Sequence, residues 1–140
     1  MGWSVMTGDA LAAGFEALIT GVTVYKDKVP SSPSFPYVYV LTNFPTVADR
    51  SQARTVSSRH LRSRTVVVGL TAASVRIIAQ KLSNALEGKR PTVAGWLLGS
   101  IESVPNEQPI QADEDVTIAG SSDHPLYQPF DWILTGSQTV

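Results

Sequence analysis

The stretch from Arg59 to Leu86 constrains the fold of this chain more than any other. It begins with alternating polar and apolar residues, becomes continuously apolar and reaches Gly69 and Leu70, a pattern that predicts a strand running into a buried sheet. Thr71 stands where it can cap a following helix. The apolar stripe of that helix comprises Val75, Ile78, Ala79, Leu82, Ala85 and Leu86. A strand and a helix joined this closely predict the core of a small α+β domain.

Shorter patterns on either side complete the predicted fold. The other expected elements are a helix over Thr7–Thr20, strands over Val22–Lys26, Tyr37–Thr42, Trp96–Val104 and Tyr127–Gly136, and one short strand at Val116–Ile118. Residues 43–58 show no periodicity and are long for a connection, which is typical of a functional or mobile loop. Two helices cover only one face of a sheet. We therefore predict an α+β fold with a mixed or antiparallel sheet of about four to five strands, two helices on one face and long loops.

The second face of the predicted sheet needs a cover of its own. Tyr37, Tyr39, Val66 and Val68 lie on strands in which neighbouring side chains alternate between faces, so they cannot all point at two helices. We expect a neighbouring subunit to cover the remainder of this face.

The composition favours one domain that assembles with partners. A chain of 140 residues is long enough for a single core and too short to expect two, so residues 1–140 are predicted to form one domain. Charged residues make up 16% of the chain, compared with roughly 25% in typical soluble proteins.

The N-terminal segment has no basic start, and Asp9 and Glu16 interrupt its apolar run. We therefore expect neither a signal peptide nor a membrane span.

The motifs of common catalytic and metal sites are missing from the sequence. There is no cysteine, which excludes disulfides, thiolate nucleophiles and zinc sites built on cysteine. His60 and His124 lack metal-binding spacing, and no nucleophile elbow accompanies the Ser121–Pro125 segment. Residues 113–115 are acidic but lack the alternation and the glycine of a calcium loop. We expect no catalytic residues, no metal, no cofactor and no enzymatic activity.

Charge is segregated along the chain, although the formal net charge is −1. All eleven Lys and Arg residues lie between residues 26 and 90 with three acidic residues, whereas residues 91–140 contain seven acidic residues and no base. These charges can neutralise one another within a subunit. They can also join neighbouring copies head to tail into a ring. Charge alone leaves both arrangements open.

Five arginines fall within fifteen residues of one another, from Arg50 to Arg64. One interpretation of these arginines is nucleic-acid binding. Against it, the pI is near 6.1, no aromatic residues lie between the arginines, and no nucleic-acid-binding motif is present. We prefer pairing of these arginines with the acidic residues between Glu102 and Asp123, within or between copies. The predicted subunit or tube interface comprises Arg50, Arg54, Arg59, Arg62, Arg64, Ile77, Glu102, Glu107, Asp113, Glu114 and Asp115.

Two passages of the chain have a recognisable spacing. The passage V-x-V-Y-x-x-x-V-P followed by F-P-Y-V-Y-V spans residues 22–40, and the helix spacing A-x-x-L-x-x-A-L begins at Ala79. Both passages resemble the tail terminator, or tail completion, proteins of long-tailed siphovirus-type phages. The order of elements matches over residues 7–136. The resemblance is one of order and spacing, and the acidic excursion after Val104 is longer than in the simplest members.

The resemblance implies a structural virion protein that forms a hexameric ring at the head-proximal end of the tail tube. Such a ring ends tube polymerisation and provides the attachment surface for the neck and head, so its partners are further copies, the tail tube protein and a neck or head-completion protein. It implies location in the virion, after assembly in the host cytoplasm, without membrane contact. The alternatives are a head-closure or adaptor protein of the neck and, more distantly, a nucleic-acid-binding module.

The implied ring sharpens the question of what the arginines contact. Genomic DNA passes through the lumen without specific binding, and a lumen lined with arginines would hold phosphates through counterion release. We therefore expect most of the arginines to face a neighbouring subunit or the tube protein. Reversing the charge of Arg59, Arg62 and Arg64 should then disturb ring formation and tail joining.

Overall fold

The computed structural model describes residues 5–43, 45–50, 56–105, 108–116 and 123–138. Its elements in chain order are α1 (Val5–Glu16), β1 (Thr23–Lys26), β2 (Tyr37–Thr42), β3 (Thr46–Arg50), β4 (Val56–Gly69), α2 (Ala72–Leu86), β5 (Trp96–Leu98), β6 (Glu102–Val104), β7 (Gln111–Ala112) and β8 (Leu126–Gln138). All of the strands belong to one sheet.

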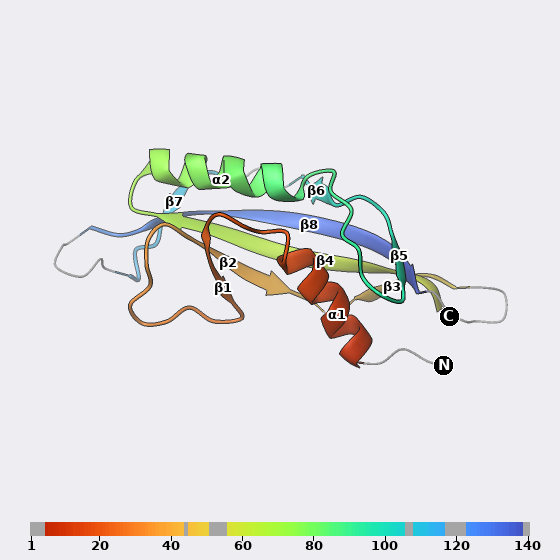
Figure 1. The fold of residues 1–140 in the computed structure, drawn as a ribbon. Helices are drawn as coiled ribbons and strands as arrows, with labels where there is room; N and C mark the ends of the chain where they lie inside the picture. Colours follow the sequence, from red (N-terminus) through yellow and green to blue (C-terminus); the bar gives the residue numbers. More distant parts are fainter. Residues whose placement is uncertain (1–4, 44, 51–55, 106–107, 117–122, 139–140) are drawn as a thin grey trace.

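Two long strands, β4 and β8, form the centre of the sheet (Figure 1). They pair antiparallel from Arg59 opposite Gly136 to Gly69 opposite Leu126. On one side, β2 and then β3 pair with successive stretches of β4. On the other side, β5, β6 and β7 pair one after another with β8. Because β1 runs parallel to β2, the sheet is mixed.

Both helices pack on the same face of this sheet. Leu11 and Phe15 of α1 are buried in the core, and the Glu16 carboxylate accepts a hydrogen bond from the Thr42 hydroxyl at 2.7 Å. The helix α2 contacts β4 and β8 through the predicted stripe, of which Val75, Ile78, Leu82 and Leu86 are buried, and Ala79 and Ala85 pack against the core. The α+β class and the position of the two helices are therefore confirmed.

The ends of α2 follow the sequence signals. The Thr71 side chain accepts a hydrogen bond from the Ser74 backbone N–H at 3.1 Å, as an N-cap does. At the other end, Gly88 has a φ of +73°, a left-handed conformation that glycine adopts without the strain of a Cβ. The predicted cap and stop of this helix are both confirmed.

Two expectations for the first half of the chain are wrong. The first helix ends at Glu16 instead of Thr20. Residues 43–58 contain β3 and the start of β4, which extend the central pair beyond β2. The pairing of β3 with β4 shifts register around Asp49, and such a bulge destroys the period of two that would have revealed the strand.

The strand expected over Trp96–Val104 is divided into β5 and β6. Between them, the Gly99 N–H still donates to the Thr135 carbonyl of β8 at 2.8 Å, but the Ile101 N–H donates to the Lys89 carbonyl at 2.7 Å, so the ladder to β8 is interrupted at Ile101. The short strand expected at Val116–Ile118 is not confirmed, because Val116 is not in a strand and residues 117–118 lie outside the described residues. A short strand, β7, forms instead at Gln111–Ala112. The main path contains five strands, as expected, and β3, β6 and β7 pair alongside it.

Candidate assembly surface

The face of the sheet opposite the helices, called the open face below, carries the candidate site. Register pairs Tyr39 with Val66 and Arg64 with Asp131, and paired residues project to the same side of a sheet. Their neighbours point the other way, into the core under the helices. The open face includes Tyr37, Tyr39, Arg62, Arg64, Val66, Val68, Asp131 and Ile133. The sequence predicted that Tyr37, Tyr39, Val66 and Val68 cannot all point at the helices, and the register places all four together on the open face.

One end of the open face forms a cavity of about 800 Å³. Its floor consists of Tyr37, Tyr39, Val66 and Val68, and its walls come from residues 29–35 and from segments near Asp113 and Pro125. The loop between β1 and β2, which supplies one wall, lies on the side of the sheet away from α2 (Figure 1). Two loops of the chain thus cover part of the open face and leave a hollow between them.

Aromatic rings pack against one another around Tyr37 of the cavity floor. The Tyr25 and Tyr37 rings meet edge to face with centroids 5.2 Å apart, and Phe35 lies against Tyr37 with centroids 5.5 Å apart. These distances lie within the range that is favourable for aromatic pairs. Burial raises the pKa of the Tyr37 phenol above its ordinary value, and the negative charge of Asp113 and the coulombic effect of Tyr25 raise it further. The phenol therefore stays neutral at physiological pH.

Two of the tyrosine hydroxyls around the cavity are bound to the chain itself. The Tyr39 hydroxyl donates to the Asp27 carbonyl at 2.7 Å, and the Tyr127 hydroxyl donates to Gln111 Oε1 at 3.3 Å. Because these two polar groups already have partners, Tyr39 and Tyr127 offer ring faces to whatever enters the cavity.

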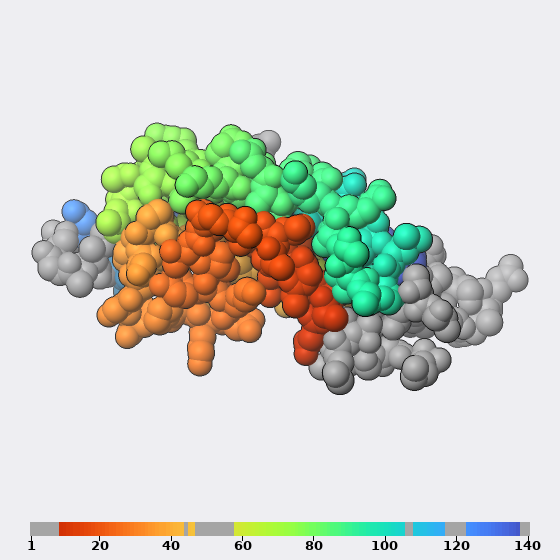
Figure 2. All heavy atoms as spheres, in the orientation of Figure 1, coloured from red at the N-terminus to blue at the C-terminus, as the bar shows by residue number. Residues whose placement is uncertain are grey.

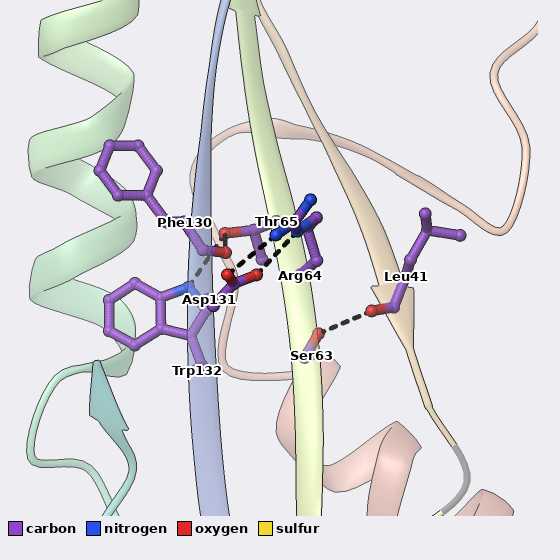
Figure 3. A network of polar contacts seen from close by, with 7 residues as sticks. All are labelled: Leu41, Ser63, Arg64, Thr65, Phe130, Asp131 and Trp132. Atoms are coloured by element: carbon purple, nitrogen blue, oxygen red, sulfur yellow. Dashed lines mark hydrogen bonds and ion pairs between the residues drawn. The ribbon is translucent and has the colours of Figure 1, made fainter. Parts of the chain in front are cut away.

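A charged region lies further along the open face. The Arg64 guanidinium donates to both carboxylate oxygens of Asp131, with Nε to Oδ1 at 2.8 Å and Nη2 to Oδ2 at 3.0 Å (Figure 3). The hydrogen bond from Arg64 and the charge of Asp131 raise the pKa of the arginine. The side chains are 50% and 25% exposed, so this pair contributes no more than about 1 kcal/mol to stability. Arg64 is nevertheless paired within its own chain.

The other arginines lie in different surroundings. Arg59 is 9% exposed, and its Nη1 donates to the Pro45 carbonyl at 2.9 Å. Arg62 is exposed on the open face and makes no ion pair with any described residue. Arg50 lies in β3, with its side chain outside the described part, and Arg54 lies outside the described residues. The cluster in the sequence is therefore divided between the interior and the surface.

The acidic candidates lie at two places on the subunit. Glu102 is exposed on β6, and register places it in one row with Ile133 and Arg62, although no ion pair joins the two charges. Asp113, Glu114 and Asp115 form a turn after β7 in which the Asp115 N–H donates to Asp113 Oδ1 at 3.3 Å. Glu107 lies outside the described residues.

The acidic turn and Arg62 cannot neutralise each other within one chain. The turn follows Ala112, which pairs with Leu126, and Leu126 pairs with Gly69. Arg62 is seven residues along β4 from Gly69, which corresponds to about 23 Å of extended strand. Asp131, which forms an ion pair with Arg64, was not among the predicted interface residues. Its alternation with Trp132 on the closing strand was the signal that placed it on the surface.

The remaining candidates for chemistry have structural partners. His60 Nδ1 lies 2.7 Å from the Thr135 hydroxyl, and His124 Nδ1 donates to the Val116 carbonyl at 2.6 Å. In the part of the chain that the structure describes, no group of three His, Asp or Glu residues could hold a metal ion. None of the described helices is both long enough and apolar enough to cross a membrane.

The predicted Ile77 contact lies on the outer side of α2, where the side chain is 59% exposed. Its neighbours Val75 and Ile78 are buried in the core. The helix therefore presents one large apolar side chain away from the subunit.

Comparison with known proteins gives a likeness of fold. The sequence matches no model of a protein family and no curated protein sequence. Among solved structures, the fold is similar to a chain in the virion of a native gene transfer agent particle, with a TM-score of 0.52 and 19% sequence identity. The match covers 94% of this chain and 91% of that chain. At this level of identity the likeness establishes a shared fold along nearly the whole of both chains.

Proposed function

We propose that this chain is a structural virion protein that forms a ring at the head-proximal end of a phage tail tube. The ring ends tube polymerisation and provides the surface to which the neck and head attach. The proposal is supported chiefly by the fold shared over 94% of the chain with a component of a gene transfer agent virion. The resemblance in the order and spacing of its elements to tail terminator proteins supports the finer assignment.

The open face supports a role in assembly rather than in chemistry. Its cavity is lined by aromatic and aliphatic side chains, and Arg62 is exposed without an ion pair among the described residues. Surfaces of this kind bind other protein subunits. In this proposal the chain has no enzymatic activity or cofactor, and DNA passes through the ring without specific binding.

Deleting the gene from its phage and imaging the lysate tests this function. We expect filled heads beside unjoined tails, many of them longer than normal, because nothing stops tube growth. Complementation with the wild-type chain should restore joined virions with tails of normal length. Unjoined tails of normal length would instead support a head-closure or adaptor role in the neck, and normal virions would contradict both.

Changing Arg62 to Glu tests the predicted arginine interface in the same complementation system. Arg59 is buried and Arg64 is paired with Asp131, so reversing either charge would also disturb the subunit. Arg62 is exposed, and its reversal should change the unfolding free energy by no more than about 0.5 kcal/mol. We expect at least a tenfold loss of infectious particles. An unchanged titre would show that Arg62 does not face a neighbour or the tube.

A further inference from the structure

We propose that the outer side of α2 in one copy docks into the aromatic cavity of the next copy, with Ile77 as the side chain that enters it. Two surfaces of the chain carry this inference. The first is an apolar cavity with an acidic border, and the second is an exposed isoleucine with basic neighbours. The inference rests on the proposed function only for the place of this contact within a tail.

The cavity is suited to an apolar side chain from a protein. Its volume is about 800 Å³, and its floor consists of Tyr37, Tyr39, Val66 and Val68. The hydroxyl of Tyr39 is already bound to the Asp27 carbonyl. The cavity therefore offers contact area more than hydrogen bonds, as the centre of a protein interface does.

The charge at its border selects a basic partner. Asp113 is the only charged residue among the described residues that line the cavity, and the adjacent Glu114 and Asp115 are exposed. None of these three forms an ion pair with a described residue. A neighbouring surface that brings cations beside an apolar group would satisfy both parts of the site.

The outer side of α2 has this combination of groups. Ile77 is 59% exposed, and Arg76 and Lys81 are exposed on the same helix without an ion pair among the described residues. Ile77 and Lys81 are four residues apart and therefore adjacent on the helix surface. Figure 2 shows α2 along the outer surface of the molecule. No acidic residue lies within α2, so its exposed charge is entirely positive.

The positions of the two surfaces fix the type of assembly. The helix and the cavity lie on opposite faces of the sheet, so Ile77 cannot reach the cavity of its own chain. When one copy inserts its helix, its own cavity and its partner's helix both stay available. Such a head-to-tail contact is heterologous, and it closes into a ring when the rotation between copies permits.

Charge exchange in the purified chain tests this contact, with self-association measured by sedimentation velocity over a range of concentrations. Arg76→Glu with Lys81→Glu should weaken association about tenfold or more, and Glu114→Lys with Asp115→Lys should do the same. The four changes together should restore association to near the wild-type level, because the attraction returns with opposite sign. Lys89→Glu with Arg90→Glu, which changes charge equally at exposed positions after α2, should leave association unchanged.

A second variant tests the apolar part of the contact. Ile77→Asp should abolish association at the concentrations where the wild type associates, while its thermal unfolding stays close to that of the wild type. The proposal is wrong if the wild-type chain stays monomeric at every concentration or if Ile77→Asp associates normally. It is also wrong if the variant with all four charge changes associates no more strongly than either double variant. Overlong, unjoined tails after gene deletion would still support the proposed function in each of those cases.

Discussion

Replacing Phe15 with alanine is expected to lower the free energy of unfolding by about 3–5 kcal/mol, the largest effect of any single substitution considered for this chain. Phe15 is 1% exposed and belongs to the same core cluster as Leu11. Among the side chains of α1 that the structure describes, these two are fully buried and anchor the helix. Truncation leaves a cavity between the helix and the sheet that the remaining side chains cannot fill.

Urea denaturation followed by circular dichroism measures this loss. Leu97→Ala provides the control, because that side chain is also large and apolar but is 69% exposed, and its loss should cost no more than about 0.5 kcal/mol. A Phe15→Ala variant as stable as Leu97→Ala would show that α1 does not pack on the sheet as described.

Thr65→Val is expected to lower the free energy of unfolding by about 1–3 kcal/mol, although the two side chains have nearly the same shape. The Thr65 hydroxyl accepts a hydrogen bond from Trp132 Nε1 at 2.9 Å and donates to the Phe130 carbonyl at 3.2 Å (Figure 3). Thr65 is fully buried and Trp132 is 3% exposed. Valine would leave the indole N–H buried without an acceptor. A buried N–H that has lost its water and has no hydrogen bond lowers the free energy of unfolding.

A double-mutant cycle separates the hydrogen bond from the packing. Trp132→Phe removes the indole donor together with part of the ring, and Thr65→Val removes the acceptor. If the bond carries the effect, Thr65→Val should cost less in the Trp132→Phe background than in the wild type by at least about 0.5 kcal/mol. Strictly additive losses of unfolding free energy would contradict this account.

The central part of the fold follows from local patterns in the sequence. Val75, Ile78, Leu82 and Leu86 recur at helical spacing because one side of α2 is fully buried, and Thr71 caps the helix through a contact three residues away. Patterns of this kind are local and can be read without the tertiary structure. The strand Tyr37–Thr42 has the predicted bounds for the same reason.

The errors lie where pairing depends on distant residues. The bulged register of β3 around Asp49 hides its alternation. The division between β5 and β6 depends on the hydrogen bond from Ile101 to Lys89, a residue outside β8. No window of neighbouring residues contains this information, so the local pattern predicts one continuous strand.

The candidate surface could be predicted only in outline. Alternation along the strands indicated that Tyr37, Tyr39, Val66 and Val68 could not all point at the helices, and in the structure all four lie on the open face. The cavity itself was not predicted, because its walls come from segments that are far apart in the chain. The division of the arginines was also missed, although Arg59 and Arg64 are an odd number of residues apart on β4 and therefore lie on opposite faces of the sheet.

The outline of the sheet determines how copies of this chain can combine. On one side of the sheet the edge strands are β1 and β3, of four and five residues, and on the other the partners of β8 are short pieces of two or three residues. Short and interrupted edges offer few free backbone groups to an added strand. Neighbouring copies are therefore not expected to extend the sheet into an open fibril, and association is left to side-chain surfaces, whose geometry can limit the number of copies.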